Sequence, residues 1–233
     1  MIFFDIDNTL LDHDYAMVQG AAVFQQEFAE AFPISKQAFT QLWVSLADQA
    51  YRHYLKGDLS LQEARIWRMQ TLFKSVDADL PPTAALSLAQ RAIDTYTSHW
   101  RLYPDVRPCL ERLADLPLGI ISNGQAEQQR AKLAAFELSD FFTIVCISSE
   151  TGAAKPAPAL FAHACKVSGF PAKACVYVGD ELETDARAAA RAGMHGIWLN
   201  RRQAATPRAD VEQVCEITSL DQLADILKKR QYP

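Results

Sequence analysis

The strongest constraint on the fold is a series of short, continuous apolar runs, most of them followed by a helical pattern. The runs occupy residues 2–6, 118–122, 143–148, 175–180 and 196–200. Continuous rather than alternating apolar runs are typical of parallel strands that are covered on both faces. Helical patterns such as "AEQQRAKLAAF", "PALFAHACKVSGF" and "ETDARAAARAG" lie between them. This βαβ succession predicts an α/β fold with a doubly wound, parallel, Rossmann-like sheet.

Residues 15–100 interrupt the succession and are helical in pattern throughout. Apolar side chains recur at helical spacing, and Ser60 with Glu63 forms a capping box at the start of one helix. We assign residues 1–14 and 88–233 to an α/β core domain and residues 15–87 to an inserted helical domain. An insert at this point can fold over the end of the first strand. Four of its aromatic residues could stack on a ligand but are expected to pack; they are Trp43, Tyr51, Tyr54 and Trp67.

Composition narrows the set of partners and locations. Hydrophobic residues make up 49% of the 233, and the formal net charge of −5 gives no electrostatic footprint for nucleic acid or an anionic membrane. No window holds the ~18 consecutive apolar residues of a membrane span. Five scattered cysteines without CxxC spacing indicate reduced thiols. We therefore expect a cytoplasmic protein, monomeric or homodimeric, without a nucleic-acid or membrane partner.

Polar side chains follow several of the predicted strands, at the point where each strand ends. Because ligands bind beyond the carboxyl ends of parallel strands, these side chains are expected to share one edge of the sheet. In chain order they are Asp5, Asp7, Thr9, Ser122, Asn123, Gly124, Lys155, Asp180, Glu181 and Asp185.

This set of residue types suits phosphoryl transfer. Carboxylates that converge on a small volume repel one another unless a cation lies between them. Oxygen ligands without nearby His or Cys indicate a hard ion, and Mg²⁺ suits a phosphate substrate. One carboxylate could then attack phosphorus. Lys155, the Ser122 hydroxyl and the backbone N–H groups of the Asn123–Gly124 turn could hold the phosphoryl oxygens.

Four segments together resemble the motifs of the haloacid dehalogenase-like superfamily. They are "DIDNT" (5–9), "ISN" (121–123), "KP" (155–156) and "GDELETD" (179–185). The resemblance covers the whole chain, because the helical insert looks like that family's cap of the first type. It implies the phosphatase branch, near members that hydrolyse nucleoside monophosphates, such as pyrimidine 5′-nucleotidases, or N-acylneuraminate 9-phosphate.

The resemblance also implies catalytic roles. Asp5 would be the nucleophile that forms an aspartyl-phosphate. Asp7 would protonate the leaving alcohol and later activate water. Ser122 and Lys155 would hold the phosphate and the nucleophile. Further phosphate-binding residues would be Thr9, Asn123 (mainly through its backbone) and Gly124.

For the metal, the resemblance implies Mg²⁺ held by Asp5, Asp180, the backbone carbonyl of Asp7, and Asp185 directly or through water. Two positions keep a structural alternative. Thr9 could cap the local backbone, and Asp185 could match the dipole of a helix start. Glu181 stands where the family often has a small hydroxyl residue, so its role stays open.

Asp7 separates the reaction classes of the family. A departing alkoxide needs a proton whereas a halide does not, and the dehalogenases lack this second aspartate. The sequence therefore predicts a Mg²⁺-dependent phosphomonoester hydrolase for a small phosphorylated metabolite, and a nucleoside 5′-monophosphate is favoured. The alternatives are a sugar-phosphate phosphatase, a phosphomutase, and a non-catalytic binding module that keeps the fold.

Overall fold

The computed structural model describes residues 1–203 and 214–229. Contacts divide the chain into two compact units, Met1–Asp12 with Leu102–Pro233, and His13–Arg101. The boundaries expected for the insert, 15–87, differ from this division because they cut through helix α4 (Pro82–Ser98). Ala85 and Ala92 of α4 lie in the core of the helical unit, so the whole helix belongs to that unit.

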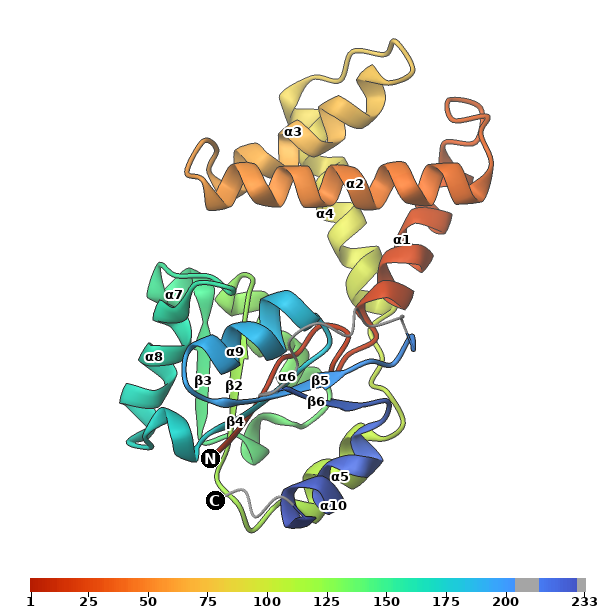
Figure 1. Ribbon diagram of the computed structural model, residues 1–233. Coiled ribbons are helices and arrows are strands. Elements are labelled where there is room, and N and C mark those ends of the chain that lie inside the picture. The colour runs from red at the N-terminus through yellow and green to blue at the C-terminus, as the bar shows by residue number, and fades with distance from the viewer. Residues whose placement is uncertain (204–213, 230–233) are drawn as a thin grey trace. The chain divides into compact units, whose positions relative to one another are not determined.

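The first unit is built on a parallel sheet, which confirms the predicted fold (Figure 1). The order of its strands is β3-β2-β1-β4-β5-β6. The chain runs from β1 outward to β2 and β3 and then crosses to β4 on the other side of β1. Ligands bind at such a switch point, beyond the carboxyl ends of the strands. The strands are β1 (Ile2–Phe4), β2 (Leu118–Ser122), β3 (Ile144–Ile147), β4 (Val176–Gly179), β5 (His195–Leu199) and β6 (Val214–Ile217).

Strand β6 was not predicted from the sequence. It pairs only with β5 in the described sheet, where Glu216 is exposed between the buried residues Cys215 and Ile217. An edge strand with one solvent-facing residue lacks the continuous apolar run that identified the other strands.

Helices cover both faces of the sheet. On one face, Phe3 and Tyr177 pack with Phe161 of α8 and Ala189 of α9. Phe4 follows Phe3 and points to the opposite face, where its ring lies 6.3 Å from that of Phe142. The helices of this unit are α5 (Val106–Arg112), α6 (Ala126–Ala135), α7 (Ser148–Thr151), α8 (Pro158–Ser168), α9 (Arg187–Arg191) and α10 (Leu223–Lys229). Single turns lie at η1 (Ser139–Phe141), η2 (Ala172–Ala174), η3 (Leu182–Ala186) and η4 (Leu220–Gln222).

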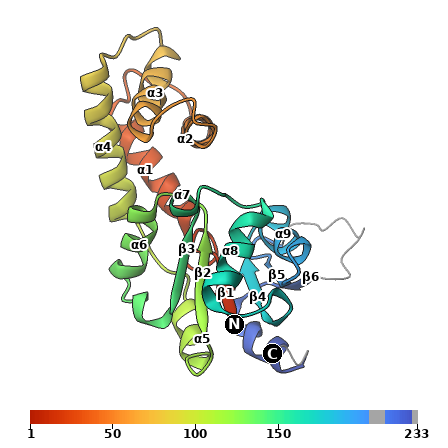
Figure 2. The ribbon, with the colours of Figure 1, turned by 90° about the vertical axis from the view of Figure 1, so that its left-hand side faces the viewer.

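The second unit consists of four helices (Figure 1 and Figure 2). They are α1 (His13–Glu27), α2 (Lys36–Leu55), α3 (Leu61–Lys74) and α4. Successive helices pack on one another, and α4 also packs on α1. The predicted capping box is confirmed, since Glu63 N–H donates to Ser60 Oγ and Ser60 N–H to Glu63 Oε2. Trp43 and Trp67 belong to the apolar core of this unit, as expected.

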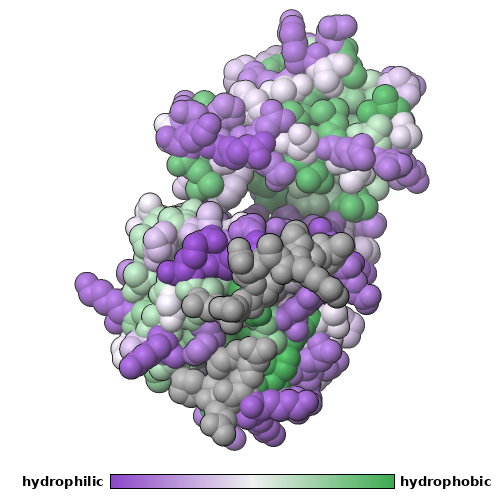
Figure 3. Space-filling model, viewed as in Figure 1, coloured by the Kyte–Doolittle hydropathy of each residue, from purple (hydrophilic) through white to green (hydrophobic). Residues whose placement is uncertain are grey.

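Among the described residues, no helix is both long enough and apolar enough to cross a membrane. The face of the molecule in Figure 3 carries many hydrophilic residues on both units.

Candidate active site

The carboxyl ends of β1 and β4 bring three aspartates together. Asp5 directly follows β1, and its N–H donates to Val178 O of β4 at 2.9 Å. Asp180 directly follows β4, and Asp185 lies in the turn η3. One carboxylate oxygen from each of these aspartates lies within 4.8 Å of the other two. The structure therefore places Asp5, Asp180 and Asp185 where they could share a metal ion.

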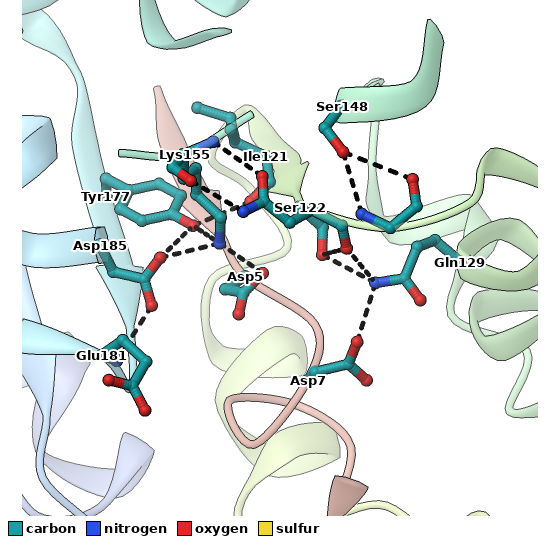
Figure 4. Close-up of polar contacts among 12 residues, drawn as sticks. Asp5, Asp7, Ile121, Ser122, Gln129, Ser148, Lys155, Tyr177, Glu181 and Asp185 are labelled. Carbon is teal, nitrogen blue, oxygen red and sulfur yellow. Dashed lines mark hydrogen bonds and ion pairs between the residues drawn. The ribbon is translucent and has the colours of Figure 1, made fainter. Parts of the chain in front are cut away.

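The approach of Asp185 depends on the glycine that ends β4. A Cβ atom at Gly179 would lie 2.5 Å from side-chain atoms of Asp185, so only glycine fits there. Glu181 N–H donates to Asp185 Oδ2 at 3.0 Å, and Trp198 Nε1 donates to the carbonyl of Asp180 at 2.8 Å. The Glu181 side chain is exposed and turned away from Lys155, so only its backbone contributes here (Figure 4).

Lys155 is the cation at the centre of this cluster. Its Nζ lies 2.8 Å from Oδ1 of Asp5 and 2.8 Å from Oδ1 of Asp185 (Figure 4). It also donates to the Tyr177 hydroxyl at 2.8 Å. Burial alone lowers the pKa of Lys155, but the carboxylates of Asp185 and Asp5 outweigh burial and hold that pKa above its ordinary value. Lys155 is therefore charged.

One ammonium group does not compensate three carboxylates. Burial, with Asp185 and Asp7 nearby, raises the pKa of Asp5 to about 6 although Lys155 opposes the rise. Burial and the neighbouring Asp5 and Asp185 raise the pKa of Asp180 to about 9. Without a further cation the cluster therefore keeps a proton at neutral pH. This excess of negative charge and the oxygen-only donor set fit a divalent hard ion such as Mg²⁺.

The Asp7 carboxylate lies apart from this cluster (Figure 4). Lys132 Nζ lies 2.6 Å from its Oδ1, and Gln129 Nε2 donates to its Oδ2 at 3.0 Å. Both donors belong to α6. The structure thus turns the Asp7 side chain away from the three clustered aspartates. Its backbone carbonyl, the group expected to bind the metal, stays a prediction.

The turn after β2 connects this region to Lys155. Ser122 is buried, and its Oγ accepts from Gln129 Nε2 at 2.8 Å. The Asn123 side chain clamps the backbone of Lys155, since Lys155 N–H donates to Oδ1 at 2.8 Å and Nδ2 donates to Lys155 O at 3.0 Å. The expectation that Asn123 acts mainly through its backbone missed this role.

Two predicted phosphate-binding positions have other surroundings than expected. Gly124 N–H already donates to Ser148 Oγ at 3.0 Å. Thr9 is fully buried, and within residues 1–203 and 214–229 its hydroxyl has no hydrogen-bond partner. Its carbonyl accepts from Arg201 at 2.9 Å. These contacts do not support a direct phosphate contact by Gly124 or Thr9, which remains a prediction.

Sequence reasoning missed three buried polar residues of the site: Tyr177, Gln129 and Lys132. Tyr177 lies within an apolar strand, where its hydroxyl is the only group that indicates a hydrogen-bond partner. Gln129 and Lys132 share one face of α6 with Leu133, a residue of the core. A charged residue next to a core position on a helix was the available signal.

Comparisons with known proteins bear on the family of the chain. The model of the haloacid dehalogenase-like hydrolase family matches residues 1–193. Human N-acylneuraminate-9-phosphatase is 26% identical over 239 residues, which cover 96% of this chain and 94% of that protein. A glyceraldehyde 3-phosphate phosphatase of Methanopyrus kandleri is 36% identical over 132 residues, or 56% of this chain and 57% of that one.

A similar solved structure is the HAD-hydrolase YfnB of Bacillus subtilis bound to magnesium, with a TM-score of 0.77. It is 22% identical and covers 97% of both chains, so this likeness shows the fold alone. The names of the two relatives support the predicted phosphatase class. The match over residues 1–193 confirms the family inferred from the four motifs: the chain belongs to the haloacid dehalogenase-like hydrolases.

Proposed function

We propose that this protein is a Mg²⁺-dependent phosphomonoester hydrolase that acts through an aspartyl-phosphate on Asp5. The proposal depends chiefly on one observation, the convergence of Asp5, Asp180 and Asp185 at the switch point of the sheet, where Lys155 pairs with Asp5 and Asp185. Bound by these aspartates, Mg²⁺ would neutralise the site and the incoming phosphate.

The residues of the chain divide the chemistry between them. The Asp5 carboxylate attacks phosphorus and forms the acyl phosphate as the ester P–O bond breaks. Asp7 gives a proton to the departing alkoxide and then takes one from the water that hydrolyses the acyl phosphate. Inorganic phosphate leaves and Asp5 is restored. Lys155 and Ser122 stabilise the negative charge on the phosphoryl oxygens.

The substrate is proposed to be a small phosphorylated metabolite. The human relative, which spans nearly the whole chain, is named for N-acylneuraminate 9-phosphate, and the M. kandleri relative for glyceraldehyde 3-phosphate. These names favour a sugar or sugar-acid phosphate. The preference for a nucleoside 5′-monophosphate stays a prediction. A phosphomutase or a binding module would keep the same aspartates.

A panel of phosphate esters tests the proposal. The full chain with Mg²⁺ is incubated with sugar phosphates, sugar-acid phosphates and nucleoside monophosphates, and free phosphate is measured. We expect release from at least one class, loss of release in EDTA, and no release by Asp5→Asn with an unchanged circular dichroism spectrum. Transfer of the phosphoryl group to a second hydroxyl, without free phosphate, would identify a mutase. No turnover of any ester would indicate a binding module.

A further inference from the structure

Helix α6 places a buried cation on the aspartate that the proposed mechanism uses as acid and base. The Lys132 side chain is 2% exposed, and its Nζ lies 2.6 Å from Asp7 Oδ1. A buried ammonium group is costly unless it is paired, so this contact accounts for the position of Lys132. The Asp7 side chain is 27% exposed, so the contacts with α6 do not bury it completely.

Gln129 holds the other oxygen of the same carboxylate. Its Nε2 lies 3.0 Å from Asp7 Oδ2, 2.8 Å from Ser122 Oγ and 3.0 Å from Asn123 O, so its two hydrogens are shared among three acceptors (Figure 4). Gln129 and Lys132 are three residues apart on α6, so both point to the same side of the helix. Two donors on two oxygens fix the orientation of the Asp7 carboxylate. Each oxygen of a carboxylate has two acceptor positions, so one contact on an oxygen does not block proton transfer there.

The hydrogen bond from Gln129 to Ser122 connects Asp7 to a residue that is proposed to bind the phosphate. Because Ser122 Oγ accepts from Gln129, its own hydrogen must point elsewhere. In the structure this hydrogen is directed to Asn123 O at 3.3 Å, a long distance for an O–H donor. A phosphoryl oxygen of the substrate could therefore accept the hydrogen bond from the Ser122 hydroxyl instead. Gln129 thus links the acid Asp7 to the phosphate-binding hydroxyl Ser122.

We propose that Gln129 and Lys132 are positioning residues that hold the Asp7 carboxylate for proton transfer to the leaving group. The inference rests on the proposed hydrolase function and adds two residues that the family motifs above do not contain. Neither residue needs to touch the substrate; both act through Asp7.

The test compares esters that differ in their need for an acid. Nitrophenolate leaves without a proton, whereas an alkyl alkoxide requires one. We expect Lys132→Met and Gln129→Leu to lower kcat/KM for an alkyl phosphate roughly tenfold to a hundredfold more than for p-nitrophenyl phosphate. KM for the alkyl phosphate should change little, and Lys132→Arg should recover part of the loss. Arg130→Met removes an exposed cation of α6 that pairs with Glu150, and this control should behave as wild type.

A rapid-mixing experiment separates positioning from folding. With p-nitrophenyl phosphate, Lys132→Met should release a full burst of nitrophenolate and then turn over slowly, because Asp7 is also needed to activate water. Equal losses of kcat/KM on both esters, or a burst reduced in proportion to the folded fraction, would overturn the inference. If Lys132→Met does not fold, Gln129→Leu and Lys132→Arg supply the same comparison. A wild-type chain that hydrolyses no ester would instead overturn the proposed function itself.

Discussion

Lys155 Nζ lies 2.8 Å from Oδ1 of Asp5, and the two side chains are 3% and 8% exposed. This buried ion pair joins the nucleophile proposed after β1 to the loop before α8. In Lys155→Met, buried carboxylates lose their cation and the phosphoryl oxygens lose a donor. We expect kcat/KM to fall by roughly a hundredfold or more. The free energy of unfolding, measured in urea at neutral pH, should fall by about 3 kcal/mol.

The matched control is Lys166→Met, which removes an exposed ammonium group from α8. It should leave both quantities unchanged, because an exposed lysine contributes little to stability. A Lys155→Met enzyme with the activity of the wild type would contradict the place given to Lys155.

The metal-free site should exchange protons for Mg²⁺. With pKa values of about 6 for Asp5 and about 9 for Asp180, the ion must displace a proton from Asp180 at neutral pH. Affinity for Mg²⁺ should therefore rise as pH increases between these two values, at most about tenfold per pH unit for one proton. Calorimetric titration across this range measures it.

Asp180→Asn removes the competing proton together with a ligand. Binding by this variant should be weaker at every pH and much less dependent on pH. Asp115→Asn, at an exposed position, serves as the control. A wild-type affinity for Mg²⁺ that does not change with pH would show that the excess of negative charge does not hold a proton on the cluster.

Tyr177→Phe tests the hydroxyl below Lys155. That hydroxyl donates to the carbonyl of Ile121 at 2.8 Å and lies 3.2 Å from Asp185 Oδ1. Its removal leaves a buried carbonyl without this donor, so we expect a loss of about 1–3 kcal/mol in the free energy of unfolding. Activity should fall less than in Lys155→Met, since Lys155 keeps its ion pair with Asp5. Unchanged thermal and urea unfolding would show that the hydroxyl is dispensable.

The pair of Arg201 and Asp105 predicts how stability depends on pH. Arg201 donates to both oxygens of Asp105, at 2.8 and 2.9 Å. Burial opposes ionisation of Asp105, but the hydrogen bonds from Arg201 and from Leu220 N–H outweigh it and hold the pKa of Asp105 below its ordinary value. A depressed pKa stabilises the fold above the unfolded value of about 3.9, and this stabilisation is lost as pH falls through the folded value.

Asp105→Asn should therefore lower the free energy of unfolding at neutral pH by about 3 kcal/mol, because Arg201 loses its buried partner. The difference from wild type should shrink in acid, where the wild type also loses the charge on Asp105. Urea unfolding at several pH values measures this difference. A gap that stays constant from neutral to acid pH would contradict the assignment.

The sequence predicted those features that follow from the rules of parallel sheets. Continuous apolar runs identify five strands, and the rule that their carboxyl ends meet places Asp5 beside Asp180. The pattern of apolar runs does not predict β6, because the exposed Glu216 breaks the run. The end of the insert, expected at residue 87, falls within α4, a helix that packs in the core of the helical unit.

Side-chain partners across elements could not be predicted in the same way. The motif at 5–9 identifies Asp7, but not that two residues of α6 hold its carboxylate. The "ISN" motif at 121–123 identifies Asn123, but not that its amide clamps the backbone of Lys155. Such contacts depend on the packing of helices on the sheet, which periodicity alone does not specify.

Trapping the covalent intermediate tests the central claim most directly. Enzyme turning over its best ester is quenched in acid and reduced with borohydride, which converts an aspartyl-phosphate to homoserine, and the N-terminal peptide is sequenced by mass spectrometry. We expect homoserine at position 5 in the wild type, with Asp7 unmodified, and none in Asp5→Asn. A turning-over enzyme with no homoserine, or with homoserine at another aspartate, would contradict Asp5 as the nucleophile.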